Sequence, residues 1–253
     1  MATDPRTQFG PAAERYLTSA AHAKSNELAA LMTRIEPQGK VLDVGTGAGH
    51  TAYALAEAGC EVVAYDMTPE MLSVVQREAA ARGLRSISVQ EGVAESLGFE
   101  DGSFDGVACR LAAHHFDDPS AFVGEAFRVI RPGGWLLLID TVSPEDPETA
   151  AELDEIETLR DPSHRHDLSV SEWGSLVESA GLGMQWVEVA RKSLDLEDWL
   201  VRMSVEDARA ATLRELILDS EGPLRKYLSP MILPDQTTFD LWEMTLFARR
   251  PVV

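Results

Sequence analysis

Three glycines at alternate positions form the stretch of the chain best suited to hold a ligand. Gly45, Gly47 and Gly49 directly follow an apolar run over residues 41–44, which contains one acid, Asp43. Glycine lacks a side chain and adopts backbone angles that other residues avoid. The main chain can therefore turn sharply here and approach a ligand closely, as it does in loops that hold nucleotides.

The spacing of the glycines distinguishes between nucleotide ligands. A dinucleotide-binding loop has the pattern G-x-G-x-x-G, whose last glycine packs the following helix against the sheet. Here that position is His50, and the third glycine comes one residue earlier. The next apolar run, residues 61–65, ends in Asp66, about twenty residues after the glycines. A carboxylate at this point can accept two hydrogen bonds from a ribose hydroxyl pair, so adenosine without a pyrophosphate fits better than NAD.

Two pairs of histidines are candidates for proton transfer, because the ordinary pKa of histidine lies near neutral pH. His114 and His115 follow a predicted strand over residues 104–109. Of the two, we expect His115 to face the ligand cleft as the catalytic base, with a structural role in the loop as the alternative. His164, in a later segment expected to cover the substrate, is the second catalytic candidate.

His164 and His166 alternate, which places both on one side of an extended segment. One interpretation is a base or a hydrogen-bond donor that faces the substrate. Another is a metal site with Asp161 or Asp167, because imidazole and carboxylate together can hold a divalent ion. No third ligand is fixed by a recognisable spacing, so we predict an exposed loop and no metal site.

The strand with Asp43, the G-x-G-x-G loop and Asp66 together resemble the class I S-adenosylmethionine-dependent methyltransferases. Later motifs extend this resemblance from about Lys40 to Asp140, and they most resemble the small-molecule methyltransferases of ubiquinone and menaquinone biosynthesis. The resemblance implies S-adenosylmethionine as cofactor and methyl transfer to a carbon, oxygen, nitrogen or sulfur atom of a small organic acceptor. Such a displacement needs mainly alignment and exclusion of water from the protein. The later motifs are residues 92–99, 103–105, 111–116 and 131–134.

The resemblance also assigns residues to parts of the cofactor. The glycine loop would accommodate the methionine part, Asp43 would order the loop or the amino group, and Asp66 would bind the ribose. Met67 would lie on the adenine face, with ordinary core packing as the alternative. Tyr16 would close a lid over the cofactor, or else pack the N-terminal segment against the body. The full implied set is Tyr16, Asp43, Gly45, Thr46, Gly47, Gly49, Asp66, Met67, Val93, Ala94, Glu95 and Arg110.

One position departs from the family pattern. Where the family commonly has an acid that takes the adenine amino group, this chain has Val93. Either a backbone carbonyl near Ala94 and Glu95 replaces that acid, or adenine recognition is weaker. Glu95 is the candidate side chain, and a surface carboxylate is the alternative interpretation.

Predicted strands and helices alternate around these residues, which indicates a parallel sheet covered on both faces. We predict an α/β fold with a Rossmann-like, doubly wound, mostly parallel sheet of seven strands and a helical lid insertion. By resemblance, the last strand, residues 240–248, runs antiparallel. The other predicted strands are 41–44, 61–65, 86–90, 104–109, 135–140 and 185–190, and the helices of the core are 26–35, 51–58, 69–82 and 119–130.

We expect the 253 residues to form a single domain with four parts. Residues 1–36 are N-terminal lid helices, one of them over 12–22, and residues 37–140 are the cofactor-binding core. Residues 141–220 cover the substrate with helices near 148–160, 171–180, 198–203 and 206–218, and residues 221–253 supply the closing strand.

The amino-acid composition limits the classes of molecule that the protein could bind. Acidic residues outnumber basic ones 42 to 22, a net charge of −20 that repels phosphate backbones and anionic membranes. We therefore expect a small-molecule methyl acceptor and neither nucleic acid nor membrane, and a homodimer is compatible with the sequence. Two cysteines and a first segment unlike a signal peptide fit a cytoplasmic protein. The alternative functions are S-adenosylmethionine binding without methyl transfer and nicotinamide-dependent oxidoreduction.

Overall fold

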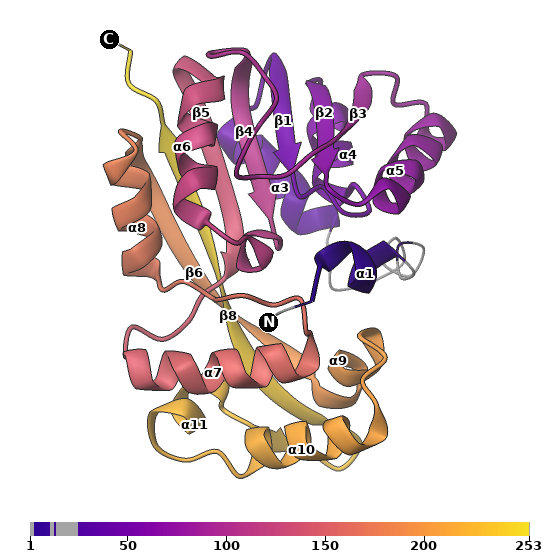
Figure 1. Cartoon of the computed structure of the whole chain (residues 1–253), viewed down its shortest axis with the longest axis vertical. Coiled ribbons are helices and arrows are strands. Elements are labelled where there is room, and N and C mark those ends of the chain that lie inside the picture. The colour runs from indigo at the N-terminus through magenta and orange to yellow at the C-terminus, as the bar shows by residue number, and fades with distance from the viewer. Residues whose placement is uncertain (1–2, 11–12, 14–24, 253) are drawn as a thin grey trace.

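The structure, a computed structural model, describes residues 3–10, 13 and 25–252 (Figure 1). Their strands form one sheet in the order β3-β2-β1-β4-β5-β8-β6, with the short β7 paired to β8. Neighbours among β1 to β5 are parallel, whereas β8 runs antiparallel to both β5 and β6. The predicted mostly parallel sheet with an antiparallel last strand is confirmed, and β7 adds an eighth strand to the predicted seven. The bounds are β1 (Lys40–Val44), β2 (Glu61–Asp66), β3 (Ile87–Glu91), β4 (Phe104–Arg110), β5 (Ile130–Thr141), β6 (Gly183–Asp195), β7 (Met231–Ile232) and β8 (Thr237–Arg249).

Helices cover both faces of this sheet (Figure 1). Side chains alternate between the faces of a strand, so Val41 of β1 packs with the helices of one face, while Leu42 and Val44 pack with those of the other. A strand buried on both faces reads as a nearly continuous apolar run, which explains residues 41–44. The first face carries α3 (Ser25–Ile35), α4 (His50–Glu57) and α5 (Pro69–Arg82), and the second carries α6 (Pro119–Val129) and α8 (Val170–Ser179).

A further group of helices lies at one end of the sheet, below it in Figure 1. These helices share their own buried core, in which Trp199 and Leu213 pack against Phe239 of β8. The segment 141–220 is therefore divided, because its strand β6 belongs to the sheet, its helix α8 packs on one face of the sheet, and its other helices belong to this group. The group comprises α7 (Pro147–Arg160), α9 (Leu196–Arg202), α10 (Asp207–Leu218) and α11 (Gly222–Leu228).

The start of α5 couples a helix end to the ligand-binding region. Pro69 occupies the first turn, where a missing backbone N–H costs nothing. Thr68 stands at the N-cap position without a side-chain cap bond, and its backbone N–H instead donates to Asp66 Oδ1 at 2.9 Å. The carboxylate at the end of β2 thus fixes the turn into α5.

The expected helix over 26–35 is present as α3, whereas α1 (Pro5–Phe9) was not predicted. The expected helix over 12–22, with Tyr16, lies outside the described residues except for Ala13. None of the helices in the described part of the chain has the length and apolar character needed to cross a membrane.

Candidate cofactor site and active site

The glycine loop leaves β1 at the carboxyl edge of the sheet, where open α/β folds bind their ligands. Gly45 and Gly47 have φ of 65° and 52°, which a residue with a side chain adopts only with strain. A Cβ on Gly45 would lie 2.4 Å from Ala112 Cβ, whereas a Cβ on Gly47 would meet no atom within 4 Å. Gly45 is therefore required for packing against the chain after β4, and Gly47 leaves open space beside the loop.

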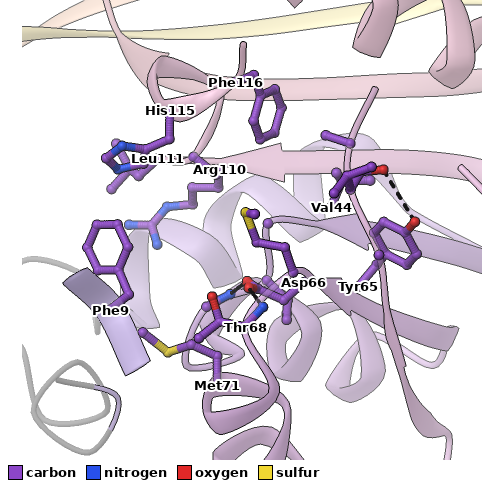
Figure 2. A pocket seen from close by; sticks show the side chains of 18 of the residues that line it. Phe9, Val44, Tyr65, Asp66, Thr68, Met71, Arg110, Leu111, His115 and Phe116 are labelled. Carbon is purple, nitrogen blue, oxygen red and sulfur yellow. Dashed lines mark hydrogen bonds between the residues drawn. The ribbon is translucent and has the colours of Figure 1, made fainter. Parts of the chain in front are cut away.

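Asp66 holds this loop from the neighbouring strand. Its Oδ2 accepts a hydrogen bond from the Gly47 backbone N–H at 2.9 Å, in addition to the bond from Thr68 to Oδ1 (Figure 2). Burial raises the pKa of Asp66, although the two backbone donors act in the opposite direction. A carboxylate has about four acceptor positions, so each oxygen keeps capacity for a ligand hydroxyl.

Asp43 lies beneath the loop and not in the cavity wall. It is 1% exposed, and its Oδ2 accepts a hydrogen bond from Thr46 Oγ1 at 2.6 Å. Burial raises the pKa of Asp43 to about 7. This position favours the indirect role, in which Asp43 orders the loop.

A cavity of about 190 Å³ lies over the loop. Of the twelve residues expected at the cofactor, Asp43 and Gly49 are absent from its wall, and Tyr16 is outside the described residues. Gly49 instead precedes α4, where a Cβ would lie 2.7 Å from the Tyr53 ring. The expected residues that do line the cavity are Gly45, Thr46, Gly47, Asp66, Met67, Val93, Ala94, Glu95 and Arg110.

The segment after β3 forms one wall. The Tyr65 hydroxyl donates to the Val93 carbonyl at 3.3 Å, which fixes the main chain at the position where the family pattern has an acid (Figure 2). Glu95 lines the cavity, but its Oε1 accepts from the backbone N–H of Asp117 at 2.9 Å and of Asp118 at 3.4 Å. Glu95 therefore joins this wall to the loop before α6.

The two adjacent histidines after β4, in the short 3-10 helix η2 (Ala113–His115), have different surroundings. His114 turns away from the cavity, and its Nδ1 lies 2.6 Å from Asp140 Oδ1. His115 lines the cavity, and its Nδ1 lies 3.3 Å from the Ser163 carbonyl oxygen. The expectation that one of the pair faces the cleft thus agrees with the structure, and His115 is that residue.

Sequence reasoning missed the residues that close the cavity. Phe9 of α1 packs edge-on against His115 with ring centroids 5.0 Å apart (Figure 2). Arg165 also lines the cavity, and its Nε donates to Asp117 Oδ1 at 2.6 Å while its Nη1 lies 3.4 Å from the Thr3 carbonyl oxygen. No local motif marks either residue, because both reach the site from segments far from it in sequence.

His164 does not line the cavity, so the structure gives no support to its prediction as a second base. It is 2% exposed, and its Nε2 lies 3.0 Å from Asp154 Oδ1 on α7. His166 Nδ1 forms a short contact with the other oxygen of Asp154. The two histidines do point to one side, as their alternation predicted, but toward α7. The expected exposed loop is a buried one at His164, because α7 covers it.

Comparisons with known proteins agree on the class to which this fold and site belong. A family model described as a methyltransferase domain matches residues 42–138. The chain belongs to the class I S-adenosylmethionine-dependent methyltransferases. This membership overrules the nicotinamide-dependent alternative.

Individual relatives extend the likeness beyond the cofactor-binding core. The uncharacterized methyltransferase YcgJ of Bacillus subtilis is 36% identical over 198 residues, which cover 78% of each chain. The solved structure of YcgJ matches with a TM-score of 0.84 over 89% of this chain and 99% of that one. The structure of BH2331 from Bacillus halodurans, 32% identical, matches with a TM-score of 0.82 over 88% and 98%. The demethylmenaquinone methyltransferase of Thermus thermophilus is 39% identical over 107 residues, 42% of this chain and 48% of that protein.

Proposed function

We propose that this cavity binds S-adenosylmethionine and that the enzyme methylates a small organic acceptor, with His115 as the proton acceptor. The observation that carries the proposal is the convergence on one cavity of an open glycine loop, the Asp66 carboxylate and the His115 imidazole (Figure 2). The bound cofactor supplies an activated methyl group on a sulfonium ion. The residues of the chain align the acceptor, exclude water and remove a proton.

Asp66 and Gly47 suit the ribose and methionine parts of the cofactor. The Asp66 carboxylate is fixed by two backbone N–H donors at 2.9 Å each, so a hydroxyl pair would meet an acceptor that is already oriented. The open space beside Gly47 can accommodate the methionine part of the cofactor without a steric clash. Because the acceptor is already held in one orientation, binding a hydroxyl group costs little further conformational entropy.

Backbone groups take over adenine recognition in our proposal. Val93 offers no acid, and Glu95 is already engaged with the loop before α6. The main chain at Val93 is held by Tyr65, and Met67 offers a polarizable side chain to an aromatic ring. This arrangement supports the backbone alternative over Glu95.

His115 is the side chain best placed to accept a proton. It is half-buried, and its desolvation, followed by the charge of His114, holds its pKa well below the usual value. The imidazole is then neutral at neutral pH and available as a base. Phe9, Leu111 and Phe116 line the same region, so we infer an acceptor with an apolar or aromatic part (Figure 2).

The size of the acceptor is limited by the cover over the cavity. The N-terminal segment is attached to the loop 161–169, because the Thr3 backbone N–H donates to the Pro162 carbonyl at 2.7 Å. Together with the net charge of −20, this cover supports a small molecule and disfavours nucleic acid.

Calorimetric titration with S-adenosylmethionine and S-adenosylhomocysteine, with NADH as control, tests the cofactor. We expect both adenosyl ligands to bind and NADH not to bind. Purified protein is then incubated with S-adenosylmethionine and a panel of phenols, thiols, amines and quinols, and S-adenosylhomocysteine is measured. Binding without S-adenosylhomocysteine release from any acceptor would favour the alternative of binding without methyl transfer. No binding of either ligand would refute the proposed site.

A further inference from the structure

Polar atoms without hydrogen-bond partners gather at one buried place outside the cavity. Asp167 is 2% exposed, and neither of its carboxylate oxygens has a partner among the described residues. The same holds there for His164 Nδ1, Glu157 Oε1 and Ser143 Oγ. Burial of a carboxylate without a compensating partner is strongly unfavourable. The cluster therefore indicates a bound partner for these atoms.

Three residues at this place lie close enough together to hold a metal ion after small side-chain rotations. Asp154, His164 and Asp167 each offer one ligand atom, and these atoms all lie within 4.8 Å of one another. Ligand atoms at about 2.0–2.2 Å from a tetrahedral zinc ion are roughly 3.3 Å apart. Side-chain rotations that move these atoms by about 1 Å would therefore be enough to coordinate an ion.

The charges of these residues, and the contacts that orient their side chains, also suit a divalent ion. Two carboxylates and a neutral imidazole would balance its charge. His166 Nδ1 contacts the second oxygen of Asp154, the kind of outer contact that orients a ligating carboxylate. Asp161, the other acid considered from the sequence, is engaged elsewhere, since its Oδ1 accepts from Ser163 N at 2.8 Å and Ser163 Oγ at 2.6 Å.

We propose that Asp154, His164 and Asp167 form a binding site for a divalent transition-metal ion. Imidazole nitrogen with carboxylate oxygen favours Zn²⁺ or Mn²⁺, whereas Mg²⁺ and Ca²⁺ prefer oxygen ligands throughout. Zn²⁺, which stands above Mn²⁺ in the general order of affinities, is the ion we expect to bind more tightly. The sequence-based expectation of no metal site is replaced by this proposal.

The ion would fasten the loop 161–169 to α7, and this loop closes the cofactor cavity. Within the loop, the Arg165 backbone N–H donates to the His114 carbonyl at 2.9 Å, and the Ser163 carbonyl faces His115. The loop also holds the N-terminal segment through Pro162. Metal binding would therefore stabilise the cover of the active site without contacting the methyl donor.

The first test measures zinc retention by untagged protein treated with EDTA, loaded with Zn²⁺ and dialysed, with Mg²⁺ in parallel. We expect roughly one Zn²⁺ per chain, and a rise in Tm of roughly 5 °C or more at about 100 times the dissociation constant. Asp167→Asn keeps the side-chain shape and should lose the retained zinc, whereas Glu155→Gln, an exposed acid next to Asp154, should keep it. No retention by the wild type, equal retention by Asp167→Asn, or equal stabilisation by Mg²⁺ would each overturn the proposal.

A second measurement uses the wild type and does not depend on how the variant folds. Trypsin cleaves after Arg165 only when the loop opens, and opening should become rarer when an ion joins the loop to α7. We expect Zn²⁺ to slow the appearance of the fragment 1–165 at least tenfold, with a peptide substrate as control for trypsin itself. An unchanged cleavage rate would contradict the proposal that the ion joins the loop to α7. Neither readout involves methyl transfer, so this proposal and the proposed function fail independently.

Discussion

The imidazole rings of the neighbours His114 and His115 lie with centroids 4.1 Å apart, yet their pKa values are displaced in opposite directions. Burial lowers the pKa of both rings. For His114, the charge and the hydrogen bond of Asp140 outweigh burial and raise the pKa to about 9. For His115, the charge of His114 adds to burial and keeps the pKa well below its usual value. A charged and a neutral imidazole thus stand side by side at neutral pH, with the neutral one in the cavity.

His115→Gln should lower kcat by about 10²- to 10⁴-fold, the usual contribution of a general base. Its affinity for S-adenosylmethionine should change less than threefold, because the side chain would act on the acceptor. Turnover is measured as S-adenosylhomocysteine formed with the acceptor found in the screen, and affinity by calorimetry. Equal losses in turnover and affinity would mean that His115 supports the cofactor instead.

The pH dependence of kcat/KM should show the effect of the His114 charge on the pKa of His115. His115 must be neutral to accept a proton, so kcat/KM falls on the acid side as pH drops through its pKa, below 6.5 in the wild type. The charged groups that act on it are His114, His164 and Arg165, and Asp161 Oδ2 lies 4.0 Å from its Nε2. His114→Gln removes a neighbouring positive charge and should move the acid limb to higher pH. An unmoved limb would show that another group controls it.

Asp66→Ala should weaken S-adenosylmethionine binding by roughly 10- to 100-fold, the range for loss of hydrogen bonds to a charged group. Glu61→Gln, an exposed acid at the start of the same strand, is the matched control and should bind normally. Calorimetry gives both affinities. Unchanged affinity in Asp66→Ala would remove the ribose assignment.

Two glycines of the loop should respond differently to substitution, because Gly45 packs against Ala112 whereas Gly47 borders open space. Gly45→Ala should lower the free energy of unfolding by about 2 kcal/mol or more, since strain at positive φ adds to a 2.4 Å clash with Ala112. Gly47→Ala carries only the strain, about 1 kcal/mol, but its Cβ would occupy the open space and weaken cofactor binding.

Denaturant unfolding of both loop variants, with calorimetry on the folded proteins, measures the contrast between them. The double variant Gly45→Ala with Ala112→Gly should recover part of the stability lost in Gly45→Ala. If the double variant recovers no stability, the loss of stability in Gly45→Ala comes from backbone strain alone.

Asp43 should make stability fall as pH rises. Its pKa is 3.8 when unperturbed and about 7 when folded, so the folded state binds the proton more tightly. The stabilisation is fully present below pH 3.8 and is lost as pH rises through about 7, by up to about 4 kcal/mol at 1.36 kcal/mol per pKa unit. Asp43→Asn cannot titrate, so its unfolding free energy should decline less between pH 4 and 8. Parallel curves for variant and wild type would exclude Asp43 as the cause.

The mostly parallel sheet and the glycine loop could be predicted from the sequence, because the alternation of strands and helices and the spacing of the glycines are read along the chain. One apolar run contains Asp43 and the next ends in Asp66, and both mark strands that are buried on both faces and end at one edge of the sheet. The role of Glu95 could not be predicted, since its partners at Asp117 and Asp118 lie more than twenty residues away. The division of the segment 141–220 between the sheet and the separate helical group was equally unreadable, because helical periodicity shows a buried face but not what covers it.

By itself, the sequence determined the family, the parallel sheet and the residues of the glycine loop, since each rests on residues adjacent along the chain. The tertiary structure alone decided which histidine lines the cavity, that Phe9 and Arg165 line it too, and that His164 lies beside Asp154 and Asp167. These are contacts between segments that only folding brings together. Burial and neighbouring charges then displace the pKa values of the adjacent imidazoles in opposite directions, and the Asp167 carboxylate lies buried without a hydrogen-bond partner among the described residues.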